Sequence, residues 1–187
     1  MIWGWTTAQV FLVFGRTGWL GGIIGKLLTD SGTSFVYSKC RLQDRAGIEA
    51  ELELLHPTHI ISAAGVTGRP NVDWCETNQV ETLRTNVLGV LNLADICEER
   101  GIHMTNFATG CIFEYDAAHP LGSGVGFSED ERANFDGSFY SKTKGYAEEM
   151  LRSYNHVLTL RVRMPIGADL EVTLTAQCHD TAPPKLS

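Results

Sequence analysis

The sequence places a tyrosine and a lysine one helical turn apart. Tyr140 and Lys144 stand in the stretch YSKTK, where the pattern predicts a helix over residues 139–154. Residues at this spacing share one face of a helix, so the ammonium would favour tyrosinate and lower the pKa of the tyrosine. Such a phenol can exchange a proton with a carbonyl or an alcohol. Ordinary surface pairs have the same spacing, so the surrounding fold must decide between the two interpretations.

Thr109 is a second candidate for chemistry, because it directly follows a predicted buried strand at residues 102–108. Parallel α/β sheets bind their ligands beyond the carboxyl ends of the strands. Thr109 is therefore expected where a reacting group would be held. Residues 110–137 contain turn signals such as LGSGVG, and we expect them to form a long functional loop.

A glycine-rich turn near the amino terminus has the pattern GxxGxxG, between an apolar run at residues 10–14 and a helical pattern at 19–30. Glycine allows backbone conformations that other residues resist and lets a pyrophosphate approach the main chain, while the helix N-terminus faces the anion. We interpret the turn as a dinucleotide site, with a purely structural turn as the alternative. The residues expected to hold the dinucleotide are Gly15, Arg16, Thr17, Gly18, Trp19, Leu20 and Gly21.

The end of the second predicted strand bears on which dinucleotide is bound. An NAD site usually has an acidic residue here to bind the ribose, but the sequence reads SKCR and has no acid before Asp44. Arg41, with Arg16 in the glycine turn, offers guanidinium donors suited to a 2′-phosphate. NADP is therefore favoured over NAD. The alternative is that Lys39 and Arg41 are solvated loop charges.

The elements that must position these groups alternate between short apolar runs and helical patterns. Strands are predicted at residues 10–14, 35–37, 59–62, 102–108 and 157–162. Helices are predicted at 19–30, from an N-cap at Asp44 to Pro57, over a long segment ending before Gly101, and at 139–154. The alternation predicts an α/β fold, a doubly wound parallel sheet of the Rossmann type with helices on both faces. The first helix should face inward through Leu20, Ile23, Ile24, Leu27 and Leu28.

Composition narrows the class of protein. The 187 residues suffice for one domain, and 43% apolar with 20% charged residues argue against disorder. The net charge of −7 gives no reason to expect nucleic acid or a membrane as a partner. Five cysteines without a CxxC pair, and histidines without ligand spacing, predict neither a disulfide framework nor a metal site. With no leader or membrane-span pattern either, we expect a cytoplasmic protein.

Several longer motifs carry a resemblance to a known family. The stretches GRTGWLGG, GRP, NVDWCE, ATGCIFEYD, HPLGSG, SFYSKTK and LRVRMP resemble the extended short-chain dehydrogenase/reductases. Within them, the chain is most similar to the bifunctional UDP- or dTDP-4-keto-6-deoxyglucose 3,5-epimerase/4-reductases, which form nucleotide-rhamnose. The resemblance implies NADPH-dependent reduction of a C4 ketone on a nucleotide sugar.

The same resemblance implies roles for individual residues. Thr109 and Tyr140 would polarise the ketone oxygen, and Lys144 would hold the nicotinamide ribose. Asn86 resembles an asparagine that helps hold the central structure. The residues implied to line the cofactor after the third strand are Ala63, Ala64 and Gly65.

Cys111 resembles the cysteine of the epimerising members, two residues beyond Thr109. Protons at C3 and C5 are α to the ketone and become acidic when its oxygen is polarised, so a thiolate could remove them. The alternative is that Cys111 is a small buried hydrophobe.

The resemblance ends at Ile166. We expect residues 1–166 to form the NADP-binding domain with the catalytic residues, and 167–187 to be a disordered tail. In the family, later chain completes the substrate site and supplies a second acid/base, so a chain ending after its sixth strand should have impaired activity. The alternative is a non-catalytic NADP-binding regulatory module acting through a partner, as in the related regulatory subunit of methionine adenosyltransferase. A homodimer is also left open.

Overall fold

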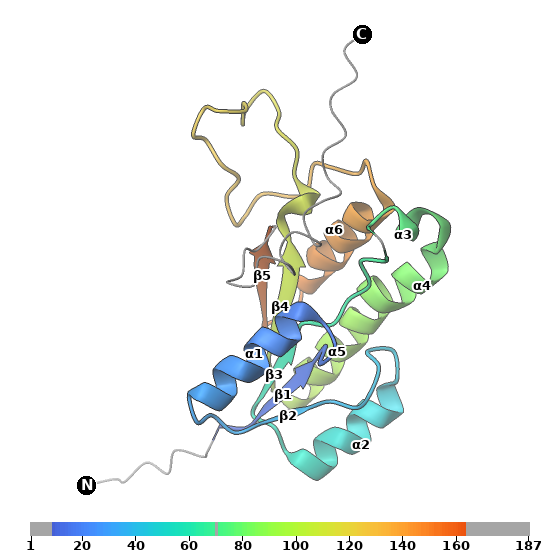
Figure 1. Ribbon diagram of the computed structural model, residues 1–187, viewed down its shortest axis with the longest axis vertical. Helices are drawn as coiled ribbons and strands as arrows, with labels where there is room; N and C mark the ends of the chain where they lie inside the picture. The colour runs from blue at the N-terminus through green and yellow to red at the C-terminus, as the bar shows by residue number, and fades with distance from the viewer. Residues whose placement is uncertain (1–8, 70, 164–187) are drawn as a thin grey trace, which may run out of the picture.

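The computed structural model describes residues 9–69 and 71–163, which form a five-stranded parallel sheet (Figure 1). The strand order is β2-β1-β3-β4-β5, which confirms the predicted doubly wound fold. The connection from β1 to β2 and the connection from β2 to β3 run in opposite directions along the sheet, so β2 and β3 lie on either side of β1. Sheets of this type bind ligands at such a switch point. The strands are β1 (Phe11–Phe14), β2 (Phe35–Tyr37), β3 (His59–Ser62), β4 (His103–Thr109) and β5 (Val157–Val162).

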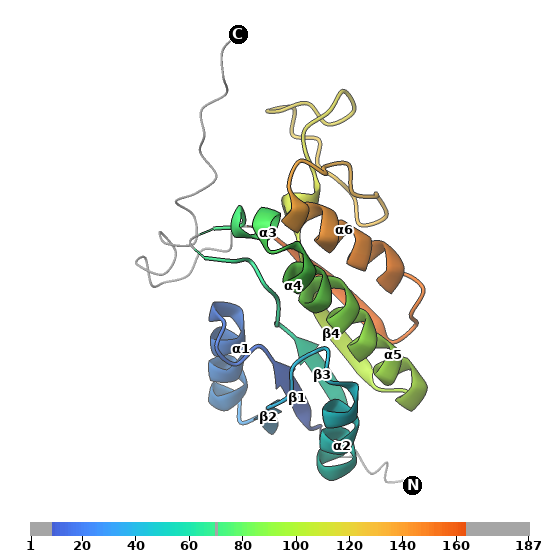
Figure 2. The same cartoon turned by 90° about the vertical axis from the view of Figure 1, so that its right-hand side faces the viewer.

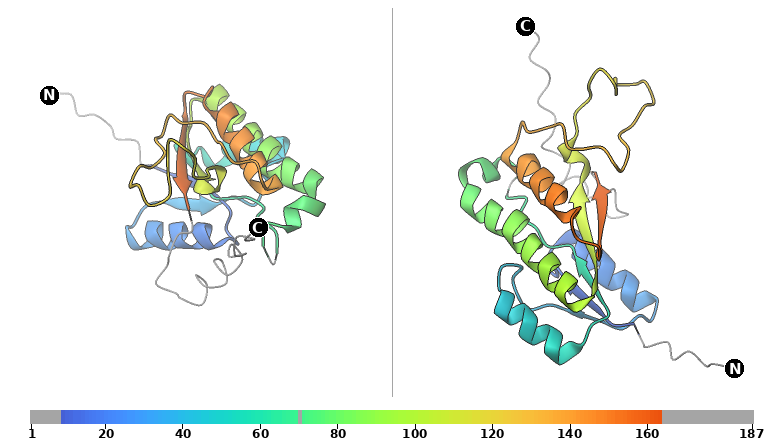
Figure 3. Two further views of the ribbon diagram at one scale, coloured as in Figure 1. Left: turned by 90° about the horizontal axis from the view of Figure 1, so that it is seen from above. Right: turned by 180° about the vertical axis from the view of Figure 1, so that it is seen from behind.

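Helices lie on both faces of the sheet, as predicted. Helix α1 covers one face, whereas α2, α5 and α6 cover the other (Figures 2 and 3). The helices are α1 (Trp19–Asp30), α2 (Arg45–Leu55), α3 (Trp74–Thr77), α4 (Gln79–Leu83), the π-helical η1 (Arg84–Gly89), α5 (Val90–Arg100), the 3-10 turn η2 (Gly110–Ile112) and α6 (Phe139–Leu151).

The main hydrophobic core lies between the sheet and the three-helix face. Strand residues such as Phe14 and Ile60 are buried against Ile48 of α2 and Leu93 of α5, and all are at most 1% exposed. The alternate strand residue Val13 points to the opposite face and is also fully buried. This burial on both faces explains why the first strand is an unbroken apolar run.

The inward face of α1 differs from the prediction. Ile23 and Leu27 are 44% and 65% exposed, whereas Gly21 and Gly25 are buried. Tyr37 from β2 packs against the glycines, and its hydroxyl donates to the carbonyl of Gly21 at 2.8 Å. The helix therefore approaches the sheet through its glycines, and a Cβ on Gly25 would lie 1.7 Å from the Tyr37 hydroxyl.

The long helical segment before β4 contains a π-helical turn. Helices α4 and α5 continue through η1, where Asn86 reaches back to the segment after β3. Its amide accepts from the main-chain N–H of Val66 and donates to the Val66 carbonyl, both at 2.8 Å. These two bonds give Asn86 the structural role that was predicted for it. The segment ends at Gly101 in the left-handed region (φ 63°).

Smaller differences concern the ends of elements. Thr109 is the last residue of β4, and α6 ends at Leu151 where the prediction ran to Tyr154. The described residues contain the five strands whose ranges were predicted, and a sixth strand would lie outside them. The predicted tail at 167–187 lies outside them.

Among the described residues there is no helix able to cross a membrane and no group of three potential metal ligands.

Candidate active and cofactor site

The glycine turn lies against the carboxyl end of β3. Gly15 has φ +99°, and a Cβ there would lie 2.6 Å from the main chain of Ala63. A Cβ on Gly21 would lie 2.1 Å from the Gly15 carbonyl oxygen, which instead accepts from the N–H of Gly18 at 2.9 Å. The first turn of α1 lies so close to the loop that only glycine fits at positions 15 and 21.

The surface of this turn is open to an anion. Arg16, Thr17 and Gly18 are exposed, and Trp19 and Leu20 begin α1 partly buried. Exposed main chain before a twelve-residue helix is the arrangement that binds a pyrophosphate. The structure thus brings the predicted cofactor residues of the turn together with Ala63 and Ala64, and Gly65 follows on the exposed side.

Arg41 lies beyond β2 with an exposed side chain that forms neither a hydrogen bond nor an ion pair to the described residues. The nearest acid in the sequence, Asp44, is engaged: it caps α2 by accepting from the N–H of Gly47 at 3.0 Å. The position beside β2 therefore offers a guanidinium with no partner in the part of the chain that the structure describes, as a 2′-phosphate requires.

An acid that the sequence did not indicate also lies at the end of β2. Glu51 comes from α2 and accepts from the Ser38 hydroxyl at 2.5 Å and from the N–H of Lys39 at 3.1 Å. Both carboxylate oxygens are thereby used to hold the strand end. No local pattern links Glu51 to β2, because the contact depends on how α2 packs.

Tyr140 lies in the first turn of α6, near the end of β4. The helix begins at an N-cap, Ser138, whose side chain accepts from the N–H of Ser141 at 3.1 Å. Burial and the neighbouring Cys111 raise the pKa of Tyr140 to about 12, although a hydrogen bond with the Thr109 side chain acts in the opposite direction. The phenol is therefore protonated at neutral pH.

Lys144 does not lower the pKa of Tyr140, and that expectation is wrong. The lysine is 7% exposed, and its Nζ donates to the carbonyl of Phe107 in β4 at 3.2 Å. Burial lowers the pKa of Lys144 to about 8, against the attraction of Glu148. Because burial raises the pKa of the phenol, the pair supplies a neutral acid and a buried ammonium rather than a tyrosinate.

Thr109 and Cys111 complete the group. The Thr109 hydroxyl is buried and accepts from the N–H of Cys111 at 3.1 Å. Cys111 lies in η2, partly buried, and close enough to affect the pKa of Tyr140. The structure therefore brings all four predicted catalytic residues to the carboxyl end of β4.

Two positions beside this group were not predicted from the sequence. Glu148, one turn beyond Lys144, is buried and accepts from the Arg161 guanidinium at 2.6 and 2.9 Å. Glu76 in α3 accepts from the first N–H of α6. The helical spacing from Lys144 could have indicated Glu148, but its partner and the contact of Glu76 come from distant segments.

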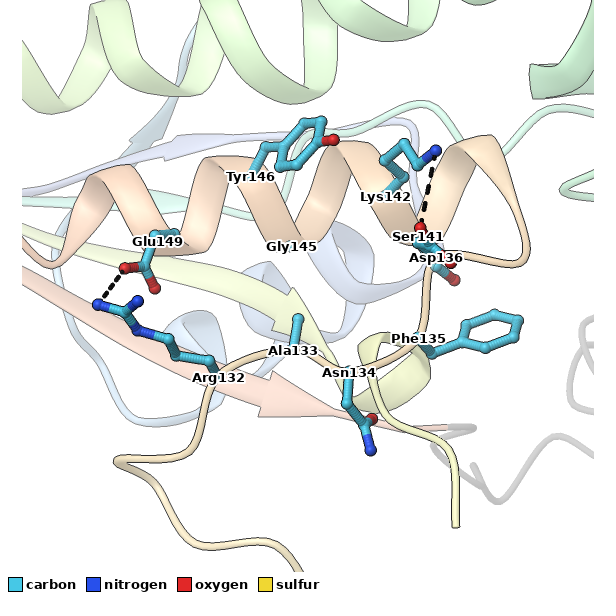
Figure 4. Close-up of a pocket in the computed structure, with 10 residues that line it drawn as sticks. All are labelled: Arg132, Ala133, Asn134, Phe135, Asp136, Ser141, Lys142, Gly145, Tyr146 and Glu149. Atoms are coloured by element: carbon cyan, nitrogen blue, oxygen red, sulfur yellow. Dashed lines mark ion pairs between the residues drawn. The ribbon is translucent and has the colours of Figure 1, made fainter. Parts of the chain in front are cut away.

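A separate pocket of about 390 Å³ lies between the segment before α6 and the outer side of that helix (Figure 4). Two ion pairs cross it, between Arg132 and Glu149 at 3.0 Å and between Lys142 and Asp136 at 3.9 Å. None of the predicted catalytic or cofactor residues lines it. Its charged groups are already paired, and it is distinct from the catalytic group.

Comparisons with known proteins bear on the family and the fold of this chain. A family model described as the RmlD substrate binding domain matches residues 9–167. The bifunctional dTDP-4-dehydrorhamnose 3,5-epimerase/dTDP-4-dehydrorhamnose reductase of Arabidopsis thaliana is 61% identical over 160 residues. A trifunctional UDP-glucose 4,6-dehydratase/UDP-4-keto-6-deoxy-D-glucose 3,5-epimerase/UDP-4-keto-L-rhamnose-reductase of the same plant is 59% identical over 160 residues.

Solved structures share the fold. The L780 UDP-rhamnose synthase of Acanthamoeba polyphaga mimivirus matches with a TM-score of 0.79 and 35% identity, covering 86% of this chain and 57% of that one. The dTDP-4-dehydrorhamnose reductase of Bacillus anthracis, in complex with NADP, has a TM-score of 0.72 over 85% of this chain and 55% of its own, at 18% identity. The matches to the Arabidopsis proteins cover 86% of this chain but 53% of the bifunctional and 24% of the trifunctional relative. The chain therefore spans about half the length of the bifunctional relative.

Proposed function

This chain belongs to the RmlD substrate-binding-domain family, and on that basis we propose that it carries the NADPH-binding and catalytic part of a nucleotide-4-keto-6-deoxyglucose epimerase/reductase. The observation that supports this most is the meeting of Thr109, Tyr140 and Lys144 at the carboxyl end of β4. A glycine turn that fits a pyrophosphate lies at the adjacent switch point of the sheet.

In the proposed reduction, Tyr140 is the proton donor. When bound, NADPH would supply the hydride for C4 of the sugar, and Tyr140 would give its phenolic proton to the C4 oxygen, so that the ketone becomes an alcohol. A pKa of about 12 keeps the Tyr140 proton in place until charge develops on that oxygen. The Thr109 hydroxyl, which accepts from the N–H of Cys111, would donate its own proton to a hydrogen bond with the same oxygen.

In the proposed epimerisation, the Cys111 thiolate is the base. Hydrogen bonds from Thr109 and Tyr140 to the ketone oxygen make the protons at C3 and C5 acidic. The thiolate removes such a proton to form an enolate, and reprotonation from the opposite side of the ring inverts the carbon. The acid for that second step lies outside the residues assigned here.

The cofactor proposed is NADP(H). The residues that would hold it are those of the glycine turn with Ala63, Ala64 and Gly65, and the Lys144 ammonium would bind the nicotinamide ribose. Arg41, with Arg16, would bind the 2′-phosphate, because the neighbouring acids Asp44 and Glu51 already accept hydrogen bonds. The proposed setting for this chemistry is the cytoplasm.

The test is NADPH oxidation by the purified chain supplied with UDP- or dTDP-4-keto-6-deoxyglucose, with nucleotide-rhamnose identified by chromatography. Since the chain spans about half of the bifunctional relative, we expect turnover below that of the Arabidopsis protein assayed at equal concentration. Tight NADPH binding without any product, even at high enzyme concentration, would contradict catalysis and favour a regulatory module.

A further inference from the structure

Apart from Lys144, whose ammonium donates to the carbonyl of Phe107, the lysines and arginines of the described residues fall into two sets. One set is paired with carboxylates at 2.5 to 3.9 Å: Lys26, Arg45, Arg100, Arg132, Lys142, Arg152 and Arg161. In the other set, the charged group forms neither an ion pair nor a hydrogen bond to any described residue. That set consists of Arg16, Lys39, Arg41, Arg69, Arg84 and Arg163.

The unpaired cations gather at one edge of the sheet. Arg16 follows β1, Lys39 and Arg41 follow β2, Arg69 lies after β3, and Arg163 follows β5. These are carboxyl ends of parallel strands, which meet at the same edge, and only Arg84 lies elsewhere, on η1. In a chain of net charge −7, an edge with free guanidinium groups attracts anions.

Arg163 is the cation of this set that lies beside the catalytic group. Thr109 pairs with Val162 in the sheet register, so Arg163 is adjacent to Gly110. A Cβ on Gly110 would lie 3.0 Å from Cβ and 3.4 Å from Cδ of Arg163. The aliphatic part of the arginine therefore lies along the main chain between Thr109 and Cys111, and the residue is exposed.

The position of Arg163 separates it from the cofactor phosphates. In the order β2-β1-β3-β4-β5, three strand spacings lie between β1 and β5, about 14 Å. A pyrophosphate on the glycine turn after β1 is thus served by that turn and not by Arg163. The Arg163 guanidinium has no partner among the described residues, so it is available to a second anion next to the proposed ketone site.

We infer that Arg163 binds the diphosphate of the nucleotide-sugar substrate. The inference rests on the proposed function, because it takes the sugar ring to lie over Thr109 and Tyr140. The diphosphate is joined to the ring carbon C1, and a planar guanidinium matches its oxygens with two parallel hydrogen bonds. Gly110 leaves room for the arginine stem, so the residue reaches past β4 without displacing Thr109.

The experiment compares binding of UDP and dTDP with binding of uridine and thymidine by calorimetry, at low salt and saturating NADP. For wild type we expect the nucleotides to bind more tightly than the nucleosides. Arg163→Gln keeps the stem through Cδ and should weaken nucleotide binding about 10-fold to 100-fold, while nucleoside binding is unchanged. Arg163→Lys keeps the positive charge but not the planar pair of N–H donors. Its nucleotide affinity should therefore lie between those of wild type and Arg163→Gln.

The matched control is Arg100→Gln, which removes the same charge from the last turn of α5, where Arg100 pairs with Glu53 at 2.6 Å. It should leave nucleotide binding unchanged. Equal nucleotide affinity in wild type and both Arg163 variants, or a wild type that does not distinguish nucleotide from nucleoside, would overturn the assignment. Hydride transfer assayed on the same preparations reports on the proposed function separately, because that reaction can fail while nucleotide binding still depends on Arg163.

Discussion

The carboxylate of Glu76 accepts a hydrogen bond from the main-chain N–H of Phe139, with 2.6 Å between Oε1 and N. Phe139 is the first residue of α6 and precedes Tyr140. The first N–H groups of a helix have no partner within it, and a carboxylate there also interacts favourably with the helix dipole. A residue of α3 thus fixes the end of the helix that carries the proposed proton donor.

Removing this carboxylate should impair ketone reduction more than cofactor binding. We expect Glu76→Ala to lower kcat about 10-fold, because a small displacement of Tyr140 has a large effect on the rate. The dissociation constant for NADPH should change little. Glu76→Gln keeps an acceptor oxygen and should recover most of kcat, and Glu81→Gln, an exposed acid on α4, serves as the control. A matching loss of NADPH affinity would mean that Glu76 supports the fold in general.

Tyr140→Phe should abolish ketone reduction, because it removes only the hydroxyl that donates the proton. NADPH binding, followed by fluorescence titration, should be nearly unchanged. Tyr146→Phe is the matched control, since Tyr146 lies on the same helix and is 55% exposed. Wild-type turnover in Tyr140→Phe would show that another group protonates the C4 oxygen.

Cys111→Ser should separate epimerisation from reduction. In heavy water, we expect this variant to lose deuterium incorporation at C3 and C5 of the ketone, because serine is a much weaker base than a thiolate. Reduction of an already epimerised ketone should persist. Cys40→Ser, near β2, should incorporate deuterium as wild type does. Undiminished incorporation in Cys111→Ser would exclude Cys111 as the base.

Arg41 should determine the choice of cofactor. We expect Arg41→Ala to weaken NADPH binding about 10-fold and to leave NADH binding nearly unchanged, because only NADPH carries the 2′-phosphate. Calorimetric titration of both cofactors measures this, with Arg100→Ala as the control. Tighter binding of NADH than of NADPH by wild type would contradict the assignment.

Burial of Lys144 predicts a pH-dependent stability. A folded-state pKa of about 8, below the ordinary value of 10.5, means that the unfolded chain binds this proton more tightly. The burial penalty is present below pH 8 and disappears as pH rises toward 10.5. Urea unfolding should therefore show that Lys144→Met gains more free energy of unfolding over wild type at pH 7 than at pH 9.5. A gain that does not depend on pH would contradict a lowered pKa.

Sequence patterns predicted the bounds of those strands and helices that depend on residues close together in the chain. Strands 35–37, 59–62 and 157–162 and the helix 19–30 were predicted with the bounds that the structure shows, because their apolar periodicity reflects burial. The face of α1 was predicted wrongly, since Tyr37 of another strand packs on its glycines. The expectation that Lys144 lowers the pKa of Tyr140 was also wrong. The spacing of the two residues reveals a neighbouring charge, but it does not reveal the burial of the phenol.

The π-helical turn η1 limits where this chain can lose a residue. A π turn holds one residue more than an α turn, and here the extra length lets Asn86 reach both polar groups of Val66. Deleting one residue between 84 and 89 would restore an ordinary α-helical turn and keep the flanking helices in register, because the π turn absorbs one extra residue. Leu93 and the other buried residues of α5 would then stay in place, but Asn86 would lose the turn from which it reaches Val66. Single-residue deletions in this segment should therefore be rejected in evolution, whereas the exposed loop at 120–126 should accept them.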